Sequence, residues 1–502
     1  MAVRSLVSKL SRLEAAGLAP APASRARAPL HPPPETPPRS SPRDAEAGAP
    51  VATPGPVRAT LLDDLRARIQ ATLERSARRV PAPPPPVDTC ELPFVTTETP
   101  LGPLHVRVQR LSGAHRTGHA PVACARDASV GLLALLALDP ALAACDPAGA
   151  LYLDTETTGL SGGAGTVAFL VGLAWWSGPT LVMEQVLVRA LGEEAPMLER
   201  VRERIAASSM LVTFNGKSFD MPLLRTRFVM ARMTAPAEPP HLDLLHVARR
   251  VHKERARRSA GACKLTALER DILGFERIDD VASGDVSAVY LHFLRTGDAR
   301  ALLGVIEHNA WDVVAMAALV GLYGEPLPLQ SRLGAEDLAG VARVLRRAGA
   351  LDEALAAAEA ALERVPQGAP DVLCHAPLRA RAEIAKARGD RAQALADFEA
   401  LAAAVDDPAV RLELAKIYEH WARSPVDALA WAERGTGETP EQAGKRARRL
   451  ARKAERARSA QSSLDLVSRP PRSPRPPRSP AAPDALDVTV SERGRRRTLR
   501  GS

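Results

Sequence analysis

The chain has 502 residues, enough for two or three domains, and carries a net charge of +9. The basic excess is uneven, because residues 445–502 hold 17 Lys and Arg against 5 Asp and Glu, a balance of +12 that leaves −3 for the rest. The folded part is therefore nearly neutral. The tail serves either to attract polyanions such as nucleic acid or only to keep the chain in solution.

Other compositional features narrow the class of protein. The five cysteines are scattered without a CxxC pair or a zinc-ligand spacing, which argues against a zinc site and fits a reducing compartment. No run reaches about 18 uninterrupted apolar residues, so we expect no membrane span. The first ten residues lack the apolar core of a secretion signal. These features together predict a cytoplasmic protein.

Both ends of the chain are of low complexity. Residues 1–86 are rich in Pro and Ala and residues 459–502 in Pro and Arg, compositions that bury too little apolar surface to fold, so we expect disorder there. An island at residues 60–73 has helical spacing and forms either a docking helix or a transient one. Residues 87–147 form a small lead-in region with short β-like runs.

The pattern from residue 148 to 325 predicts a layered α/β domain. Three apolar runs joined by short turns indicate an antiparallel meander, and a helix then leads to a fourth, parallel strand. The first predicted strand begins at residue 150 and carries Asp154 and Glu156. The other strands are predicted at residues 166–175, 180–188 and 210–214, and helices at 193–207, 221–232, 242–254, 265–273, 286–294 and 299–322. The prediction is a mixed sheet flanked by helices.

A helical region follows, at residues 335–458. A turn followed by Ala-Leu recurs at Ala354, Ala394 and Ala428, at intervals of 40 and 34 residues. Such a period is typical of helical-hairpin repeats of the tetratricopeptide kind. Repeats of this type present a surface to a protein partner, so we expect this region to bind a protein partner.

Four acids and a histidine stand where they could meet. Asp154 and Glu156 follow an apolar run two residues apart, so as part of a strand they project from one face. Asp220 follows the predicted fourth strand and opens a helix, while His308 and Asp312, four residues apart, share one face of the last helix of the domain. We expect these side chains to converge at one end of the sheet.

Three segments resemble the exonuclease motifs of the DEDD superfamily, whose fold is ribonuclease H-like. They are Asp154-Thr-Glu156-Thr-Thr-Gly159, Asn215-Gly-Lys-Ser-Phe219-Asp220-Met-Pro222 and His308-Asn-Ala-Trp-Asp312. The chain is most similar to the YprB-like branch, from the Thr-Pro-Leu-Gly at residues 99–102, the His-Leu-Asp at 241–243 and the later helical repeats. The resemblance covers residues 92–434.

The resemblance implies hydrolysis of phosphodiester bonds with two divalent ions about 3.5 to 4 Å apart, Mg²⁺ or Mn²⁺ by the hardness of the oxygen ligands. It implies that Asp154 bridges the ions, that Glu156 and Asp312 complete one site, and that Asp220 binds the second ion. His308 is implied as the base that deprotonates the attacking water, since an imidazole pKa of about 6.5 suits neutral pH. The His308 to Asp312 gap is that of the tyrosine-bearing branch of the superfamily, so His308 takes the tyrosine position.

Five further residues are candidate substrate contacts. By resemblance, Thr157, Thr158 and Gly159 meet the terminal nucleotide through backbone amides, although a plain strand-to-loop turn also explains them. Asn215 and Phe219 either contact the substrate strand or fix their turn.

Other charged residues leave two interpretations open. Asp243 is expected to be a hydrogen-bonding scaffold acid rather than a metal ligand. The basic residues within 249–258, like Lys217, Arg225 and Arg227, either meet phosphates or lie on solvated helix faces.

Three functions are compatible with this pattern. The first is a 3′–5′ exonuclease acting on single-stranded DNA or RNA, and the second is a nucleic-acid-binding or scaffolding protein with little turnover. The third is an endonuclease with the same metal chemistry. The complete set of acids favours an enzyme, because crowded like charges destabilise a fold unless a cation compensates them.

Overall fold

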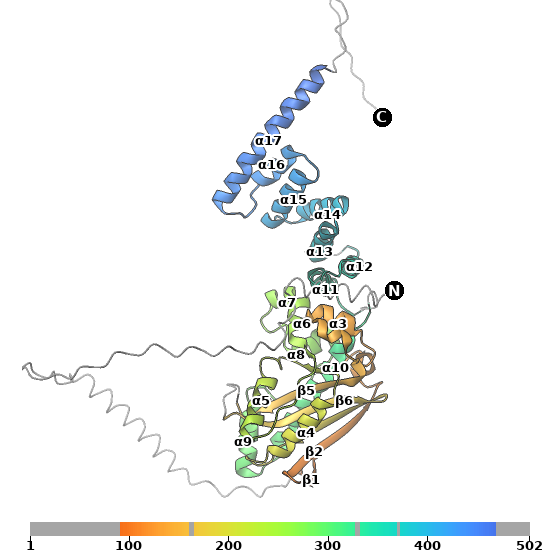
Figure 1. Cartoon of the computed structure of the whole chain (residues 1–502), viewed down its shortest axis with the longest axis vertical. Helices are drawn as coiled ribbons and strands as arrows, with labels where there is room; N and C mark the ends of the chain where they lie inside the picture. The colour runs from red at the N-terminus through yellow and green to blue at the C-terminus, as the bar shows by residue number, and fades with distance from the viewer. Residues whose placement is uncertain (1–90, 160–164, 327–331, 369–371, 468–502) are drawn as a thin grey trace, which may run out of the picture. The chain divides into compact units, whose positions relative to one another are not determined.

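The computed structural model describes residues 91–159, 165–326, 332–368 and 372–467, and Figure 1 draws the whole chain. It forms two compact units, Met1–Val410 and Arg411–Ser502. The predicted disorder and helical island of residues 1–86 lie outside the described residues, as do residues 468–502.

A seven-stranded mixed sheet forms the centre of the first unit. Its order is β1-β2-β7-β6-β5-β8-β9, antiparallel from β1 to β5, with β8 parallel to β5 and β9 parallel to β8. The strands are β1 (Val95–Thr99), β2 (Gly102–Ser112), β5 (Ala150–Thr157), β6 (Ala168–Ser177), β7 (Thr180–Leu187), β8 (Met210–Thr213) and β9 (His241–Asp243). The predicted meander and parallel strand are confirmed. Because β2 pairs with β7, part of the lead-in region belongs to this same sheet.

Helices cover both faces of the sheet, and the alternation of β5 decides which face each side chain meets. Leu151 and Leu153 pack against α4 (Ala195–Ala206) and α5 (Asp220–Met230). Tyr152 packs on the opposite face, in the cluster that contains α10 (Arg300–Tyr323). Figure 1 shows α4 lying across the sheet. Asp154 and Glu156 have the parity of Tyr152, so they face α10.

Two predicted helices are corrected by the structure. The helix predicted from residue 242 is preceded by β9, and α6 runs only over Leu244–Val251, because Asp243 accepts a hydrogen bond from the Leu245 amide and caps the helix there. The helix predicted at 265–273 is α8 (Leu265–Leu268) followed by a π-helical turn, η4 (Glu269–Leu273). A three-residue strand is too short to show period-two alternation in the sequence.

The long helix α10 passes through the core of the domain. By length and composition it is apolar enough to cross a membrane, with a mean hydropathy of 1.3, but 72% of that stretch is buried inside the protein. It packs on β5, β6 and β7. We therefore interpret α10 as a core helix, which explains why it is apolar around most of its circumference.

The remaining elements of the first unit complete the layers. They are the ribbon β3 (Arg116–Thr117) and β4 (Ala120–Pro121), the 3₁₀ turns η1 (Val122–Ala125), η2 (Pro140–Ala144) and η3 (Pro147–Gly149), and the helices α3 (Val130–Ala137), α7 (Lys253–Arg258), α9 (Val286–Thr296), α11 (Ala335–Arg347), α12 (Leu351–Glu363), α13 (Val372–Arg388) and α14 (Arg391–Ala404). Helices α11 to α14 pack in sequence, each on the next, and α11 packs on α6 and α3.

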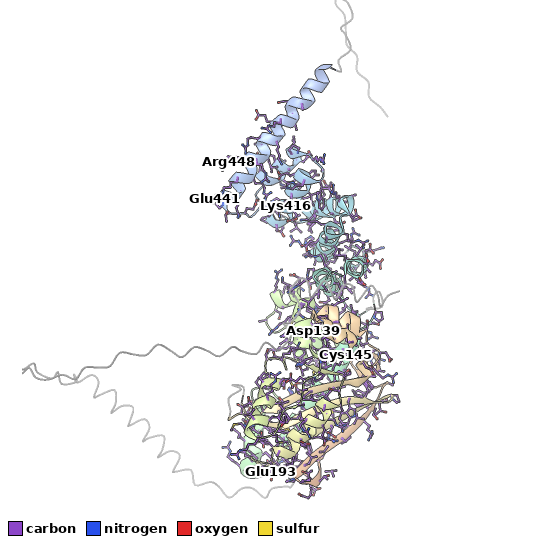
Figure 2. The ribbon with its side chains drawn as sticks, viewed as in Figure 1. Asp139, Cys145, Glu193, Lys416, Glu441 and Arg448 are labelled. Atoms are coloured by element: carbon purple, nitrogen blue, oxygen red, sulfur yellow. The ribbon has the colours of Figure 1, made fainter. Side chains whose placement is uncertain are left out.

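The second unit is helical. It contains most of α15 (Pro408–His420), followed by α16 (Pro425–Glu433) and α17 (Pro440–Val467). Figure 2 labels Lys416 on α15 and Glu441 and Arg448 on α17. The disordered tail was predicted from residue 459, but α17 continues to Val467 because neither Pro nor Gly interrupts it before Pro470. The helical region is confirmed, while its tetratricopeptide class stays a prediction.

Candidate metal centre

The carboxylates of β5 meet helix α10 at the carboxyl end of the strand. Asn309 on α10 donates a hydrogen bond from Nδ2 to Asp154 Oδ2 at 2.9 Å. Glu156, two residues further along the strand, is only 9% exposed. The predicted common face of Asp154 and Glu156 is thus the face that α10 covers.

The side-chain amide of Asn309 is held by hydrogen bonds at both its nitrogen and its oxygen. It is fully buried, and its Oδ1 accepts a hydrogen bond at 2.9 Å from Gln185, which also donates to the Ile306 carbonyl. Gly172 lies directly opposite Asp154 in the register of β5 and β6, and a Cβ there would come within 2.8 Å of Val313 on α10. Gly172 therefore permits the close approach that brings Asn309 to Asp154.

His308 and Asp312 join Glu156 in the tightest cluster of the site. One ligand atom from each of the three residues lies within 4.8 Å of the others. His308 Nε2 is 3.7 Å from Asp312 Oδ2, as the four-residue spacing on one helix face predicts. The site therefore offers two carboxylates and an imidazole at one point.

Residues in the segment that follows α8 hold the side chains of His308 and Asp312 in place. The guanidinium of Arg277 forms a bidentate ion pair with buried Glu269, at 2.7 and 2.8 Å, and also donates to Asp312 Oδ1. Asp280 Oδ1 is 2.6 Å from His308 Nδ1. Asp312 and His308 are thus each oriented through one of their two polar atoms.

Asp220 reaches the group from the other side of the strand. Thr155 donates a hydrogen bond from Oγ1 to Asp220 Oδ1 at 2.6 Å, and Thr155 has the opposite parity from its acidic neighbours on β5. Asp220 is the first residue of α5 and is only 4% exposed. It is near enough to raise the pKa values of both Asp154 and Glu156.

Burial and mutual repulsion perturb the acids strongly. Burial, with Asp312 and Asp220 adding to it against the opposing charge of His308, raises the pKa of Glu156 to about 8. Burial likewise raises the pKa of Asp154, where the other carboxylates add to it, and that of Asp220 to about 6, where the Thr155 hydrogen bond opposes it. The protein alone therefore compensates these charges incompletely.

For the pKa of His308, the neighbouring charges outweigh the effect of burial. Burial lowers the pKa of His308, but Asp312 and the hydrogen bond to Asp280 outweigh it, so that the pKa lies above its ordinary value of 6.5.

The donor set fits a divalent cation. Glu156 is nine-tenths buried, yet within the described ranges its carboxylate has neither a hydrogen bond nor an ion pair. A buried ionised carboxylate without a partner is costly, and a cation bound by Glu156, His308 and Asp312 would remove that cost. Asp154 and Asp220 border this cluster without belonging to it.

A cavity of about 640 Å³ opens beside the acids. Asp154, His308 and Asp312 line it, and so do two basic residues, Arg249 and Lys264. A volume of this size is typical of small-molecule and nucleotide pockets.

The candidate substrate contacts after β5 are partly engaged already. The Thr158 amide donates to the Val167 carbonyl at 3.0 Å, so it is not available to a nucleotide. Thr157 is buried and donates its hydroxyl to the Gly159 carbonyl. For Thr158 the plain-turn interpretation is the one the hydrogen bonds support, which corrects the amide contact predicted for it.

Asn215 and Phe219 lie in the turn between β8 and α5. Asn215 has a left-handed backbone (φ 70°) and lines the cavity, whereas Phe219 directly precedes α5 and donates its amide to the Asn215 carbonyl. Asp243 accepts hydrogen bonds from the amides of Asn215 and Lys217 at 2.9 and 3.1 Å. The scaffold interpretation of Asp243 is confirmed.

Most of the candidate phosphate contacts are committed to ion pairs. Arg225 pairs with Glu238, and Arg227 is buried against Glu194. In the basic cluster, Arg255, Arg257 and Arg258 pair with Asp337, Glu254 and Glu336 respectively. Arg249 is exposed and lines the cavity, so it is the member of the cluster best placed to meet a phosphate.

Sequence reasoning missed the residues that support the acids. Asn309 stood inside the third motif without being singled out, although a polar residue among apolar helix positions was a visible signal. Arg277 and Asp280 lie in a loop with no periodic pattern, Glu269 lies in the π-helical turn, and Thr155, between the two acids, was not singled out.

The strand order, the acids at the end of β5 and the acid-bearing core helix together define a ribonuclease H-like domain. Residues 151–323 match the sequence family described as the RNase H superfamily. The chain is also 36% identical over 170 residues to the uncharacterized protein YprB of Bacillus subtilis (strain 168). That match covers 34% of this chain and 40% of the relative, so it spans less than half of the relative's length. The family match thus covers the part of the chain that carries Asp154, Glu156, Asp220, His308 and Asp312.

Proposed function

We propose that this protein is a 3′–5′ exonuclease of the DEDD type that hydrolyses single-stranded nucleic acid with two divalent ions, Mg²⁺ or Mn²⁺. The observation that carries the proposal is the cluster of Glu156, His308 and Asp312, with Asp154 and Asp220 held beside it by Asn309 and Thr155.

The acids would hold the ions, Glu156 and Asp312 one of them, Asp220 the other, and Asp154 both. When bound, the ions supply charge stabilisation at the attacking and leaving oxygens and make a coordinated water acidic. Asn309 keeps Asp154 turned toward α10, and Thr155 keeps Asp220 at the strand end. The chain thus presets the acids, so little reorganisation is needed at reaction.

The cavity supports a single strand as substrate. Arg249 and Lys264 are exposed cations on its wall, and neither forms an ion pair within the part of the chain that the structure describes. Arg249 and Lys264 can neutralise a backbone phosphate while the ions held by the acids bind the scissile phosphate. A contact of this kind reads no base, so we expect little sequence preference and a strong dependence on salt.

The test uses the purified full-length chain with Mn²⁺ or Mg²⁺ on 5′-labelled linear and on circular single strands of DNA and RNA. We expect linear strands to shorten stepwise from the 3′ end and circles to survive. Asp154→Asn should abolish cleavage, whereas Asp279→Asn, an exposed acid outside the site, should retain it.

Two results would overturn the proposal. Cleavage of circles would assign an endonuclease instead. Inertness toward every substrate and both metals would favour the scaffolding function, in which the helical region recruits a protein partner.

A further inference from the structure

We propose that His308 is itself a metal ligand, so that Glu156, His308 and Asp312 form a mixed carboxylate and imidazole site that takes a first-row transition ion such as Mn²⁺ in preference to Mg²⁺. The inference rests on the proposed function, because it concerns the same centre. It gives His308 a role other than that of general base.

The tautomer of His308 is fixed by its neighbour. His308 is 6% exposed, and its Nδ1 lies 2.6 Å from Asp280 Oδ1. An ionised carboxylate only accepts hydrogen bonds, and Asp280 is closer to Nδ1 than the Arg277 guanidinium, whose Nη1 lies 3.3 Å away. Nδ1 therefore carries the proton, and the neutral ring presents a lone pair at Nε2. This carboxylate-imidazole arrangement is the one that orients histidine ligands in metal sites.

Across the ranges that the structure describes, Nε2 of His308 is the ring nitrogen without a hydrogen bond, and it lies beside the Asp312 carboxylate. Asp312 Oδ2 lies 3.7 Å away, too far for a hydrogen bond, and Nε2 has no hydrogen-bond partner among the residues described. Glu156 is equally buried and equally unpartnered over the same ranges. With Nδ1 held by Asp280, Nε2 is the nitrogen left to join Glu156 and Asp312 in the cluster.

The distances are those of a shell that a cation would close. Ligand atoms about 2.1 Å from one ion lie up to roughly 4.2 Å apart. The three residues already place one ligand atom each within 4.8 Å of one another, so a small contraction suffices. Arg277 engages Asp312 Oδ1, which leaves Oδ2 directed toward His308.

The chemistry of the donors sets the selectivity. Mg²⁺ takes oxygen ligands in a strict octahedron, whereas first-row transition ions accept imidazole nitrogen readily. One nitrogen in place of an oxygen therefore shifts the preference of this site toward the transition ion.

The experiment detects the nitrogen directly and does not depend on turnover. Full-length protein is loaded with one equivalent of Mn²⁺ at pH 7.5, and the electron spin echo envelope is recorded with natural-abundance and with ¹⁵N-histidine protein. We expect a directly coordinated histidine nitrogen that changes with the label. His308→Gln should abolish it and reduce the Mn²⁺ affinity about 10- to 100-fold, with a smaller change for Mg²⁺.

A matched pair of variants tests how His308 is oriented. Asp280→Asn should weaken Mn²⁺ binding about 10- to 100-fold, because the ring loses its charged partner. Asp279→Asn makes the same change one residue away, at an exposed position whose backbone (φ 55°) Asn tolerates, and should leave the affinity unchanged.

The outcomes separate this inference from the proposed function. Bound Mn²⁺ without a nitrogen coupling, in protein that still degrades single strands, overturns the ligand role and leaves the exonuclease standing. Protein that binds neither Mn²⁺ nor Mg²⁺ overturns both. An unchanged ratio of Mn²⁺ to Mg²⁺ affinity in His308→Gln also refutes the inference.

Discussion

Replacing Glu156 by Gln should stabilise the metal-free protein at neutral and alkaline pH. The pKa of Glu156 is raised to about 8 from an ordinary 4.5, so the folded state binds the proton more tightly than the unfolded state. The stability that this proton contributes is complete below about pH 4.5 and is lost as the pH rises toward 8. The linkage relation gives a loss of about 3 kcal/mol in the free energy of unfolding between pH 5 and pH 8.

The Gln side chain keeps the shape of Glu and does not titrate. The free energy of unfolding of the variant should therefore lack the part of its pH dependence that comes from residue 156. Native-state hydrogen exchange of β5 and β6 amides in EDTA, compared between wild type and variant at each pH, reports the unfolding free energy of this unit. The advantage of Glu156→Gln over wild type should grow by about 3 kcal/mol from pH 5 to pH 8. Glu276→Gln, at an exposed acid, should show no such growth.

Metal should remove most of the advantage that Glu156→Gln has over wild type near neutral pH. Mn²⁺ at 100 times its dissociation constant stabilises a protein that binds it by about 2.7 kcal/mol. Wild type should gain this amount at pH 7.5, while Glu156→Gln gains much less. Parallel pH profiles of wild type and variant in EDTA would refute the idea that burial and repulsion hold Glu156 protonated.

Two further substitutions test packing, one beside the centre and one where α11 packs on α6. Gly172→Ala should lower the free energy of unfolding by about 1–3 kcal/mol and weaken Mn²⁺ binding measured by titration calorimetry, because the new Cβ crowds Asn309 and Val313. Asp337→Ala should cost about 3–5 kcal/mol in urea unfolding, because it removes the buried carboxylate that lies 2.8 Å from His252 Nδ1 and that pairs with Arg255.

Each of these has a neighbouring control. Gly165→Ala meets nothing within 4 Å and should be neutral in both assays. Glu336→Ala removes only a surface pair with Arg258 and should cost less than about 1 kcal/mol. A neutral Gly172→Ala would mean that α10 can move away from β6 without loss, and equal effects of Asp337→Ala and Glu336→Ala would mean that burial adds nothing to the first pair.

The main layout of the site followed from periodicity. Two-residue alternation placed Asp154 and Glu156 on one face of β5, and the four-residue interval placed His308 beside Asp312 on α10. Both rules concern neighbours in the chain, which is why sequence alone could apply them. Asp220 was expected at a helix start after a strand, and it is found there.

The contacts between distant segments were beyond such rules. Nothing local in Gly172 says that it faces Asn309, because the two meet only when β6 and α10 pack together. Arg277 and Asp280 lie after a π-helical turn whose wider backbone no hydrophobic pattern encodes. Their partners, Asp312 and His308, are reached through tertiary structure alone.

The charge around the centre connects its architecture to its chemistry. Six carboxyl groups gather there against one guanidinium and one imidazole, namely Asp154, Glu156, Asp220, Glu269, Asp280 and Asp312 against Arg277 and His308. Arg277 compensates the side of the cluster at Glu269 and Asp312, whereas on the side of β5 burial raises the pKa values and the neighbouring carboxylates add to this effect. A fold that fixes Asp154, Asp220 and Asp312 through separate hydrogen bonds, yet leaves the buried Glu156 without one among the described residues, is organised for cations that arrive from outside, and Glu156 is where their effect on stability should be largest.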